Sequence, residues 1–92
     1  MPKLTPAELQ TALQTRNAWT IEAEILTRTF QFENFVAAIA FVNRVAEYAE
    51  GAAHHPDIDI RYNRVRIGLT THDDSGISEK DIALAAQLDG IA

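Results

Sequence analysis

The sequence predicts an α+β fold, a single-layer four-stranded antiparallel sheet with three helices packed on one face. Two observations lead to this expectation. Helical and alternating apolar patterns follow one another in the order α-β-β-α-β-β-α, and short turn segments separate the two strands of each pair. No repeat, linker or low-complexity segment interrupts the pattern, so we expect residues 1–92 to form a single domain.

The first helix is predicted from a complete N-terminal capping motif. Thr5 is placed as the N-cap, Pro6 fills the first helical position, and Glu8 completes a capping box three residues after the cap. The apolar stripe behind this signal is short. We therefore expect the helix to fade near Arg16, and we expect no chemistry from it.

Two strand patterns come next, over residues 19–21 and 26–32, with a turn at residues 22–24. The second strand places Leu26, Phe30 and Phe32 on one face, and its two phenylalanines are expected in the core. Trp19 begins the first strand, where its large ring can either pack in the core or roof a pocket.

The longest helical pattern covers residues 33–51. Phe35, Ile39 and Val42 begin its apolar stripe, and many alanines flank the stripe, so a sheet or a partner helix can approach closely. Gly51 is the expected C-cap, because glycine adopts the left-handed conformation that often ends a helix.

A hairpin pattern follows over residues 57–69. If residues 63–64 form a two-residue turn, three apolar pairs fall on one face, and a slip of one residue breaks every pair. The expected pairs are Tyr62–Val65, Ile60–Ile67 and Ile58–Leu69.

The last helix is expected from Ser78 to about Gly90. Ser78 is the N-cap, and Asp81 sits where the return partner of a capping box belongs. Spacing alone therefore favours a capping role for Asp81 over a chemical one.

Composition limits the possible functions. The formal net charge is −5, which disfavours direct nucleic-acid binding, because such proteins need a basic face. There is no cysteine, so there is no disulfide framework, and the chain carries no redox information about its compartment. We find no signal peptide and no apolar run that could span a bilayer, so we expect a cytoplasmic protein without membrane contact. A chain of 92 residues is near the lower limit for burying a sufficient core alone, which favours an oligomer.

All three histidines lie near the open ends of the predicted hairpin. Extending the hairpin register places His72 opposite His55, although Pro56 can end the ladder. Neighbouring residues of a straight strand point to opposite faces, so a loop at residues 52–54 is needed to bring His54 and His55 into one pocket. Glu50 lies four residues before His54, so its carboxylate could reach that imidazole.

Three interpretations of these histidines stay open at this point. They can be unrelated surface or core residues. They can bind zinc, although adjacent histidines coordinate one tetrahedral ion poorly. They can also be metal-free acid/base groups, since imidazole titrates near neutrality. No serine or cysteine nucleophile, phosphate loop or dinucleotide motif accompanies them.

The spacing of these residues resembles the signature of the pterin-4a-carbinolamine dehydratases. The resemblance covers roughly residues 19–91 and includes Trp19 and the run L-T-R-T-F-Q-F-E-N-F. A small departure is Ser75-Gly76-Ile77, where the family more often has Gly-Gly-Leu. The motif itself reads Glu50-x-x-x-His54-His55-Pro56, followed by Tyr62, His72 and Asp81.

The resemblance implies dehydration of 4a-hydroxytetrahydropterin to quinonoid dihydropterin, with the pterin as substrate and no metal or other cofactor. His54, held by Glu50, and His72 are then the acid/base pair, and His55 binds or orients the pterin. Other pocket members that the resemblance suggests are Trp19, Pro56 and Asp81.

The resemblance also implies partners. Family members form homodimers or homotetramers through the sheet edge and the long helix, and the reaction recycles the cofactor of aromatic amino acid hydroxylases. The same fold resembles non-catalytic binding modules, namely dimerisation cofactors of transcription factors and Rubisco assembly factors. The retained histidines favour the enzyme.

Overall fold

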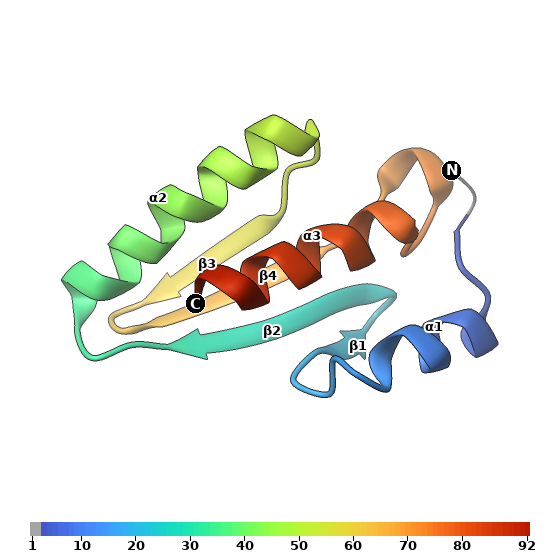
Figure 1. The fold of residues 1–92 in the computed structure, drawn as a ribbon, viewed down its shortest axis with the longest axis horizontal. Helices are drawn as coiled ribbons and strands as arrows, with labels where there is room; N and C mark the ends of the chain where they lie inside the picture. Colours follow the sequence, from blue (N-terminus) through green and yellow to red (C-terminus); the bar gives the residue numbers. More distant parts are fainter. Residues whose placement is uncertain (1–2) are drawn as a thin grey trace.

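The computed structural model describes residues 3–92 and shows the predicted architecture, with one additional short 3-10 turn (Figure 1). The helices and strands are α1 (Pro6–Leu13), β1 (Thr20–Glu22), β2 (Ile25–Gln31), α2 (Phe35–Ala52), β3 (Asp57–Arg61), β4 (Arg64–Leu69), the 3-10 turn η1 (His72–Asp74) and α3 (Glu79–Ile91).

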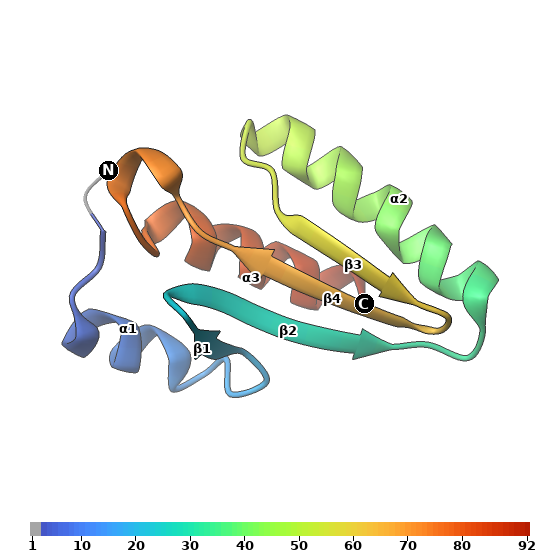
Figure 2. The same ribbon diagram turned by 180° about the vertical axis from the view of Figure 1, so that it is seen from behind.

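The four strands form one antiparallel sheet in the order β1-β2-β4-β3, so β2 and β4 are central and β1 and β3 are edges (Figure 2). Helices α2 and α3 lie over the same face of this sheet (Figure 1). The core forms between the central strands and these two helices. Its largest fully buried apolar side chains are Leu26, Phe41, Val45, Val65, Ile67, Leu69, Leu84 and Leu88.

The β3–β4 hairpin keeps the predicted face, but the predicted register is wrong by two residues. The turn occupies residues 62–63 instead of 63–64. Because side chains alternate with a period of two, a slip of two residues leaves the same side chains facing the core, and the apolar pattern cannot detect it. The observed pairs are Asp57–Gly68, Ile58–Ile67, Asp59–Arg66, Ile60–Val65 and Arg61–Arg64.

The starts of α1 and α3 agree with the sequence, whereas α1 ends earlier than expected and α2 begins and ends later than expected. Both predicted capping boxes are present, at the starts of α1 and α3. Helix α1 stops at Leu13, before Arg16, and α2 continues past Gly51 to Ala52. The left-handed residue that ends α2 is Ala53 (φ 52°, ψ 39°), whose N–H group bonds to backbone carbonyl oxygens of the last turn.

Trp19 lies in the core, with 2% of its surface exposed. Its ring meets Phe30 edge-on, and its indole N–H donates a hydrogen bond of 2.9 Å to Oδ1 of Asp89 in α3. Of the two positions that the sequence left open for Trp19, the structure therefore shows the core.

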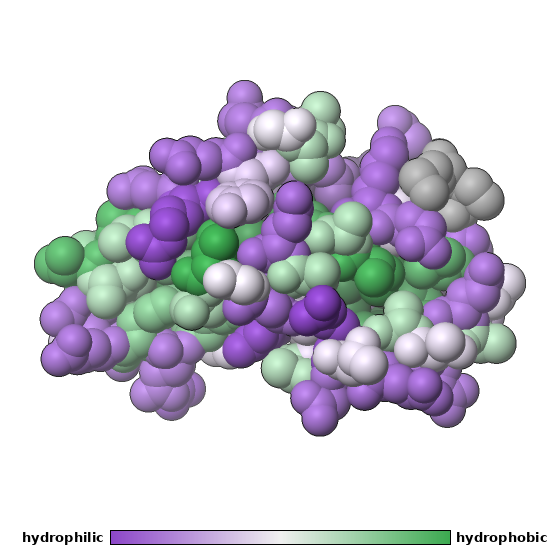
Figure 3. Space-filling model, viewed as in Figure 1, coloured by the Kyte–Doolittle hydropathy of each residue, from purple (hydrophilic) through white to green (hydrophobic). Residues whose placement is uncertain are grey.

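Hydrophilic residues cover much of the face shown in Figure 3, and apolar surface interrupts them, including at the end where α2 begins. Phe35 and Val36, the first two residues of α2, are exposed there. Within residues 3–92, no helix has both the length and the apolar character needed to cross a bilayer.

Candidate active site

A cleft of about 260 Å³ brings the three histidines together. Its walls come from three segments, namely the α2–β3 connection, the end of β4 with η1, and the first turn of α3. The lining residues are Ala53, His54, His55, Thr70, Thr71, His72, Asp73 and Lys80.

The left-handed conformation of Ala53 turns the chain out of α2 just before the two neighbouring histidines. The backbone N–H of His54 still bonds to the carbonyl oxygen of Ala49 at 3.0 Å, and β3 begins only at Asp57. Residues 54–56 therefore belong neither to the helix nor to the ladder. The loop predicted at residues 52–54 is therefore present, but it covers residues 53–56, because Ala52 is still helical.

His54 is bound by Asp81, and the predicted contact with Glu50 is wrong. The Nε2–H group of His54 donates to Oδ1 of Asp81 at 2.5 Å. The side chain of Asp81 is fully buried and that of His54 is 12% exposed. Oδ2 of the same carboxylate accepts the backbone N–H of Ser78 at 2.9 Å, so Asp81 both caps α3 and orients His54.

Glu50 contacts the other neighbouring histidine. Its Oε2 accepts a hydrogen bond from Nε2 of His55 at 2.5 Å, and the two side chains are 75% and 66% exposed. Ion pairs this exposed contribute little to stability, because water screens them. The chain leaves the helix at Ala53, so the i, i+4 geometry expected for Glu50 and His54 does not form.

His72 begins the turn η1 and is exposed. Because β4 ends at Leu69, His72 is not in the ladder, and the prediction that it pairs across the strands with His55 is wrong. Its imidazole forms no hydrogen bond with any group of residues 3–92. The ring is thus available to a ligand in the cleft.

Some predicted site members lie elsewhere, and some lining residues were not predicted. Trp19 and Pro56 are not among the residues that line the cleft, whereas Lys80, Asp73 and Thr70 are. Thr70 and Asp73 flank the Thr71-His72 pair, and Lys80 precedes Asp81, so their position next to motif residues was the available signal.

The arrangement suits proton transfer. With Nε2 held by a carboxylate, which can only accept, the neutral ring of His54 has its unprotonated nitrogen at Nδ1. Nδ1 forms no hydrogen bond within residues 3–92 and can take a proton from a bound molecule. Over the described part of the chain, no group of three or more His, Asp or Glu side chains is arranged to hold a metal ion.

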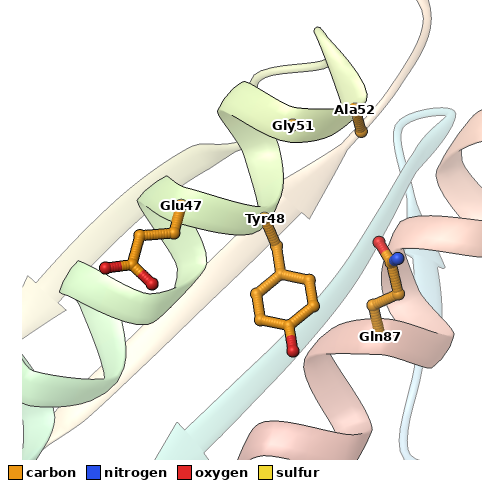
Figure 4. Close-up of a pocket in the computed structure, with 5 residues that line it drawn as sticks. All are labelled: Glu47, Tyr48, Gly51, Ala52 and Gln87. Carbon is orange, nitrogen blue, oxygen red and sulfur yellow. The ribbon is translucent and has the colours of Figure 1, made fainter.

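A larger cleft of about 520 Å³ lies between α2 and α3 (Figure 4). Tyr48 and Gln87 extend toward the space between the two helices, and Gly51 and Ala52 form its upper wall in this view. None of its lining residues is a histidine, so it is not the candidate site for proton transfer.

Comparison with solved structures shows which known folds this chain resembles. A solved structure from Brucella melitensis, described as a transcriptional coactivator/pterin dehydratase, matches with a TM-score of 0.93 and 38% identity and covers 98% of each chain. A second, described as a pterin dehydratase-like protein that is a RuBisCO assembly factor in the alpha-carboxysome, matches with a TM-score of 0.71 and 26% identity. It covers 82% of this chain and 89% of that one.

The family itself is also shown by sequence. The profile of the family described as Pterin 4 alpha carbinolamine dehydratase matches residues 2–91. A protein from Chloroflexus aurantiacus, provisionally named a pterin-4-alpha-carbinolamine dehydratase, is 58% identical over 91 residues, which is 99% of this chain and 98% of that protein. A protein of the same provisional name from Acidobacterium capsulatum is 52% identical over 99% of both chains. This chain belongs to the pterin-4-alpha-carbinolamine dehydratase family.

Proposed function

We propose that this protein dehydrates 4a-hydroxytetrahydropterin to quinonoid dihydropterin and water. The observation that supports this proposal most is the convergence of three imidazoles on one cleft, with His54 oriented by a buried carboxylate. The names given to the relatives agree with such an activity.

The reaction needs two proton transfers. The C4a–O bond breaks when an acid protonates the departing hydroxyl, and the C=N bond forms when a base takes the ring N–H proton. One proton moves from ring to leaving group and water departs, so no electron acceptor is required. We assign the base to Nδ1 of His54, because Asp81 stabilises the imidazolium that forms.

His72 is then the acid, since its imidazole faces the same cleft and has no partner among the described residues. His55, held by Glu50 at the rim, contacts and orients the pterin. In the cell the reaction would recycle the pterin cofactor of an aromatic amino acid hydroxylase, and the protein would act as a homodimer or homotetramer.

The test is stopped-flow absorbance of 4a-hydroxytetrahydropterin decay with purified protein. We expect decay to be accelerated in proportion to protein concentration. A control with the His54→Ala, His72→Ala double variant, which removes both proposed groups, corrects for any non-specific catalysis by protein. Decay no faster than in buffer would exclude the enzyme.

The alternative is a non-catalytic assembly or coactivator module, which the descriptions of the two structural relatives suggest. Edge strand β3 is exposed along its whole length and offers such a surface. A neighbouring phenylalanine hydroxylase gene would support the enzyme, and a carboxysome or Rubisco operon would support the module. Absence of acceleration in the stopped-flow assay would leave the module as the better proposal.

A further inference from the structure

A buried chain of hydroxyl groups lies behind the histidine cleft. Oγ1 of Thr71 is 2.8 Å from Oγ of Ser78 and donates to Oδ2 of Asp81, also at 2.8 Å. A hydroxyl has only one proton to donate. Because Thr71 uses its proton on Asp81, Ser78 donates to Thr71, and Oγ of Ser78 in turn accepts the N–H of Lys80 at 3.3 Å. Each hydrogen bond in this series therefore has a fixed donor and acceptor, and the last acceptor is the Asp81 carboxylate.

These hydrogen bonds fix the orientation of the Asp81 carboxylate, which in turn holds His54. Oδ2 of Asp81 receives two donors, the Thr71 hydroxyl and the Ser78 backbone N–H. With both in place the carboxyl group cannot rotate without losing a hydrogen bond in a site that water does not reach, which is costly. Oδ1 is therefore held toward Nε2 of His54.

The backbone of Thr71 supports the second histidine. Its N–H bonds to the carbonyl oxygen of Gly76 at 3.0 Å, and its own carbonyl oxygen accepts the N–H groups of Asp74 and Gly76 at 3.1 and 3.3 Å. These bonds close the turn that begins with His72, the next residue in the chain. One buried residue is thus connected to both proposed acid/base groups.

We infer that Thr71 is a positioning residue that sets His54 and His72 relative to each other. Its hydroxyl, through Asp81, keeps His54 in the tautomer with a free Nδ1, and its backbone anchors the turn that carries His72. The kinetic part of this inference rests on the proposed function, whereas the tautomer part does not.

The tautomer is tested on the full-length protein by ¹⁵N NMR of the imidazole groups at neutral pH. The wild-type His54 should show a protonated Nε2 and an unprotonated Nδ1. Thr71→Val, which keeps the shape and removes the donor, should give a mixture of tautomers, and Thr71→Ser should restore the wild-type pattern. An unchanged His54 spectrum in Thr71→Val would overturn the inference, whether or not the protein is an enzyme.

Kinetics provide the second test. Thr71→Val should lower kcat for pterin dehydration by about fivefold, the size of one lost hydrogen bond of average strength, with KM within twofold and Thr71→Ser near wild type. If Thr71→Val does not fold, Thr71→Ala replaces it, because alanine introduces no methyl group beside the carboxylate.

Thr27 provides a matched control for general destabilisation. It is a buried threonine of β2 whose hydroxyl lies 3.2 Å from both Oγ1 of Thr20 and Oε2 of Glu22, and it does not line the cleft. Thr27→Val should lower stability without changing kcat. An equal loss of kcat in the Thr27 and Thr71 variants, or no loss in the Thr71 variant, would overturn the positioning role.

Discussion

His54 and His55 are neighbours in the chain, yet their imidazoles have opposite surroundings. His54 is nearly buried and bonds to a fully buried carboxylate, whereas His55 is exposed and bonds to the exposed Glu50. A hydrogen bond in a low-dielectric environment is stronger and more directional than one in water. We therefore expect the two histidines to contribute very differently to the chemistry.

Removing either proposed acid/base group should slow pterin dehydration strongly. His54→Ala and His72→Ala are each expected to reduce the rate by roughly 10²-fold or more, the usual scale for a general acid or base. Stopped-flow absorbance with saturating substrate measures the effect. Rates equal to wild type in both variants would remove the role assignment.

The two carboxylates that bind histidines should differ in their effect on stability. Asp81→Asn places an amide among hydrogen-bond donors in a buried site and should lower the free energy of unfolding by about 3 kcal/mol. Glu50→Gln, in an exposed pair, should cost less than about 1 kcal/mol. Urea denaturation of the two variants measures both values, and equal losses would contradict this assignment of partners.

The histidine partners show where prediction from the sequence stops. The spacing of Glu50 and His54 favours a contact only if the helix continues through His54. The helix ends at Ala52, and Ala53 caps it in the left-handed conformation, a position that glycine or asparagine would normally mark. Alanine gives no such signal. The sequence therefore predicted that the histidines share a site, but it could not predict which carboxylate binds which histidine.

Helix α3 is fastened at both ends by buried or partly buried carboxylates. Asp81 holds its first turn, and Asp89, near its end, accepts hydrogen bonds from Trp19, Arg28 and Arg16. Arg28 also lies 4.1 Å above the ring centre of Phe30. This second cluster connects α3 to β2 and to the segment that follows α1.

Loss of the Asp89 cluster should destabilise the fold without touching the histidine cleft. Asp89→Ala is expected to lower the free energy of unfolding by about 2 kcal/mol, because it removes charged hydrogen bonds at a partly buried site. For a domain of this size the melting temperature should fall by roughly 8–16 °C. The control is Asp59→Ala, in an exposed pair with Arg61, which should change little. Similar losses in both variants would contradict the structural role of Asp89.

Two single substitutions at the end of α2, Gly51→Ala and Ala53→Gly, should each stabilise the protein. Gly51 is helical and a Cβ there would meet nothing within 4 Å, so Gly51→Ala should add about 1 kcal/mol. Ala53→Gly relieves the left-handed backbone and should add a similar amount. Urea denaturation measures each change. A loss of stability from Gly51→Ala would show that this helix end is not as described.

Most elements were predictable because their signals are local. The Thr5–Glu8 and Ser78–Asp81 capping boxes identified two helix starts, and alternation identified the strands. The hairpin register was not predictable from the same alternation, because the observed pairing of Ile60 with Val65 and the expected pairing with Ile67 put Ile60 on the same face.

Several large apolar side chains are exposed on the described part of the molecule. Edge strand β3 is exposed throughout, including Ile58 and Ile60, and Phe35 and Val36 are exposed at the start of α2. The face of the sheet that α2 and α3 do not cover carries polar pairs such as Arg66 with Glu22. The apolar areas are therefore the surfaces on which we expect copies of the chain to meet.

Self-association should be visible in solution. Light scattering should give a mass two or four times the 10.2 kDa of one chain, and the melting temperature should rise with protein concentration, because association stabilises the folded state. A mass of one chain at every concentration would exclude the oligomer.

The double duty of Asp81 has a consequence for the history of such proteins. Its Oδ2 accepts the Ser78 N–H that caps α3, and its Oδ1 binds His54. Selection for folding alone would therefore preserve the aspartate. Under the proposed function, a descendant that gave up catalysis for an assembly role could lose His54 and His72 but would keep Asp81 for the helix cap. An aspartate at this position therefore carries no information about activity, and the histidines are the residues that would report whether the proposed chemistry survives.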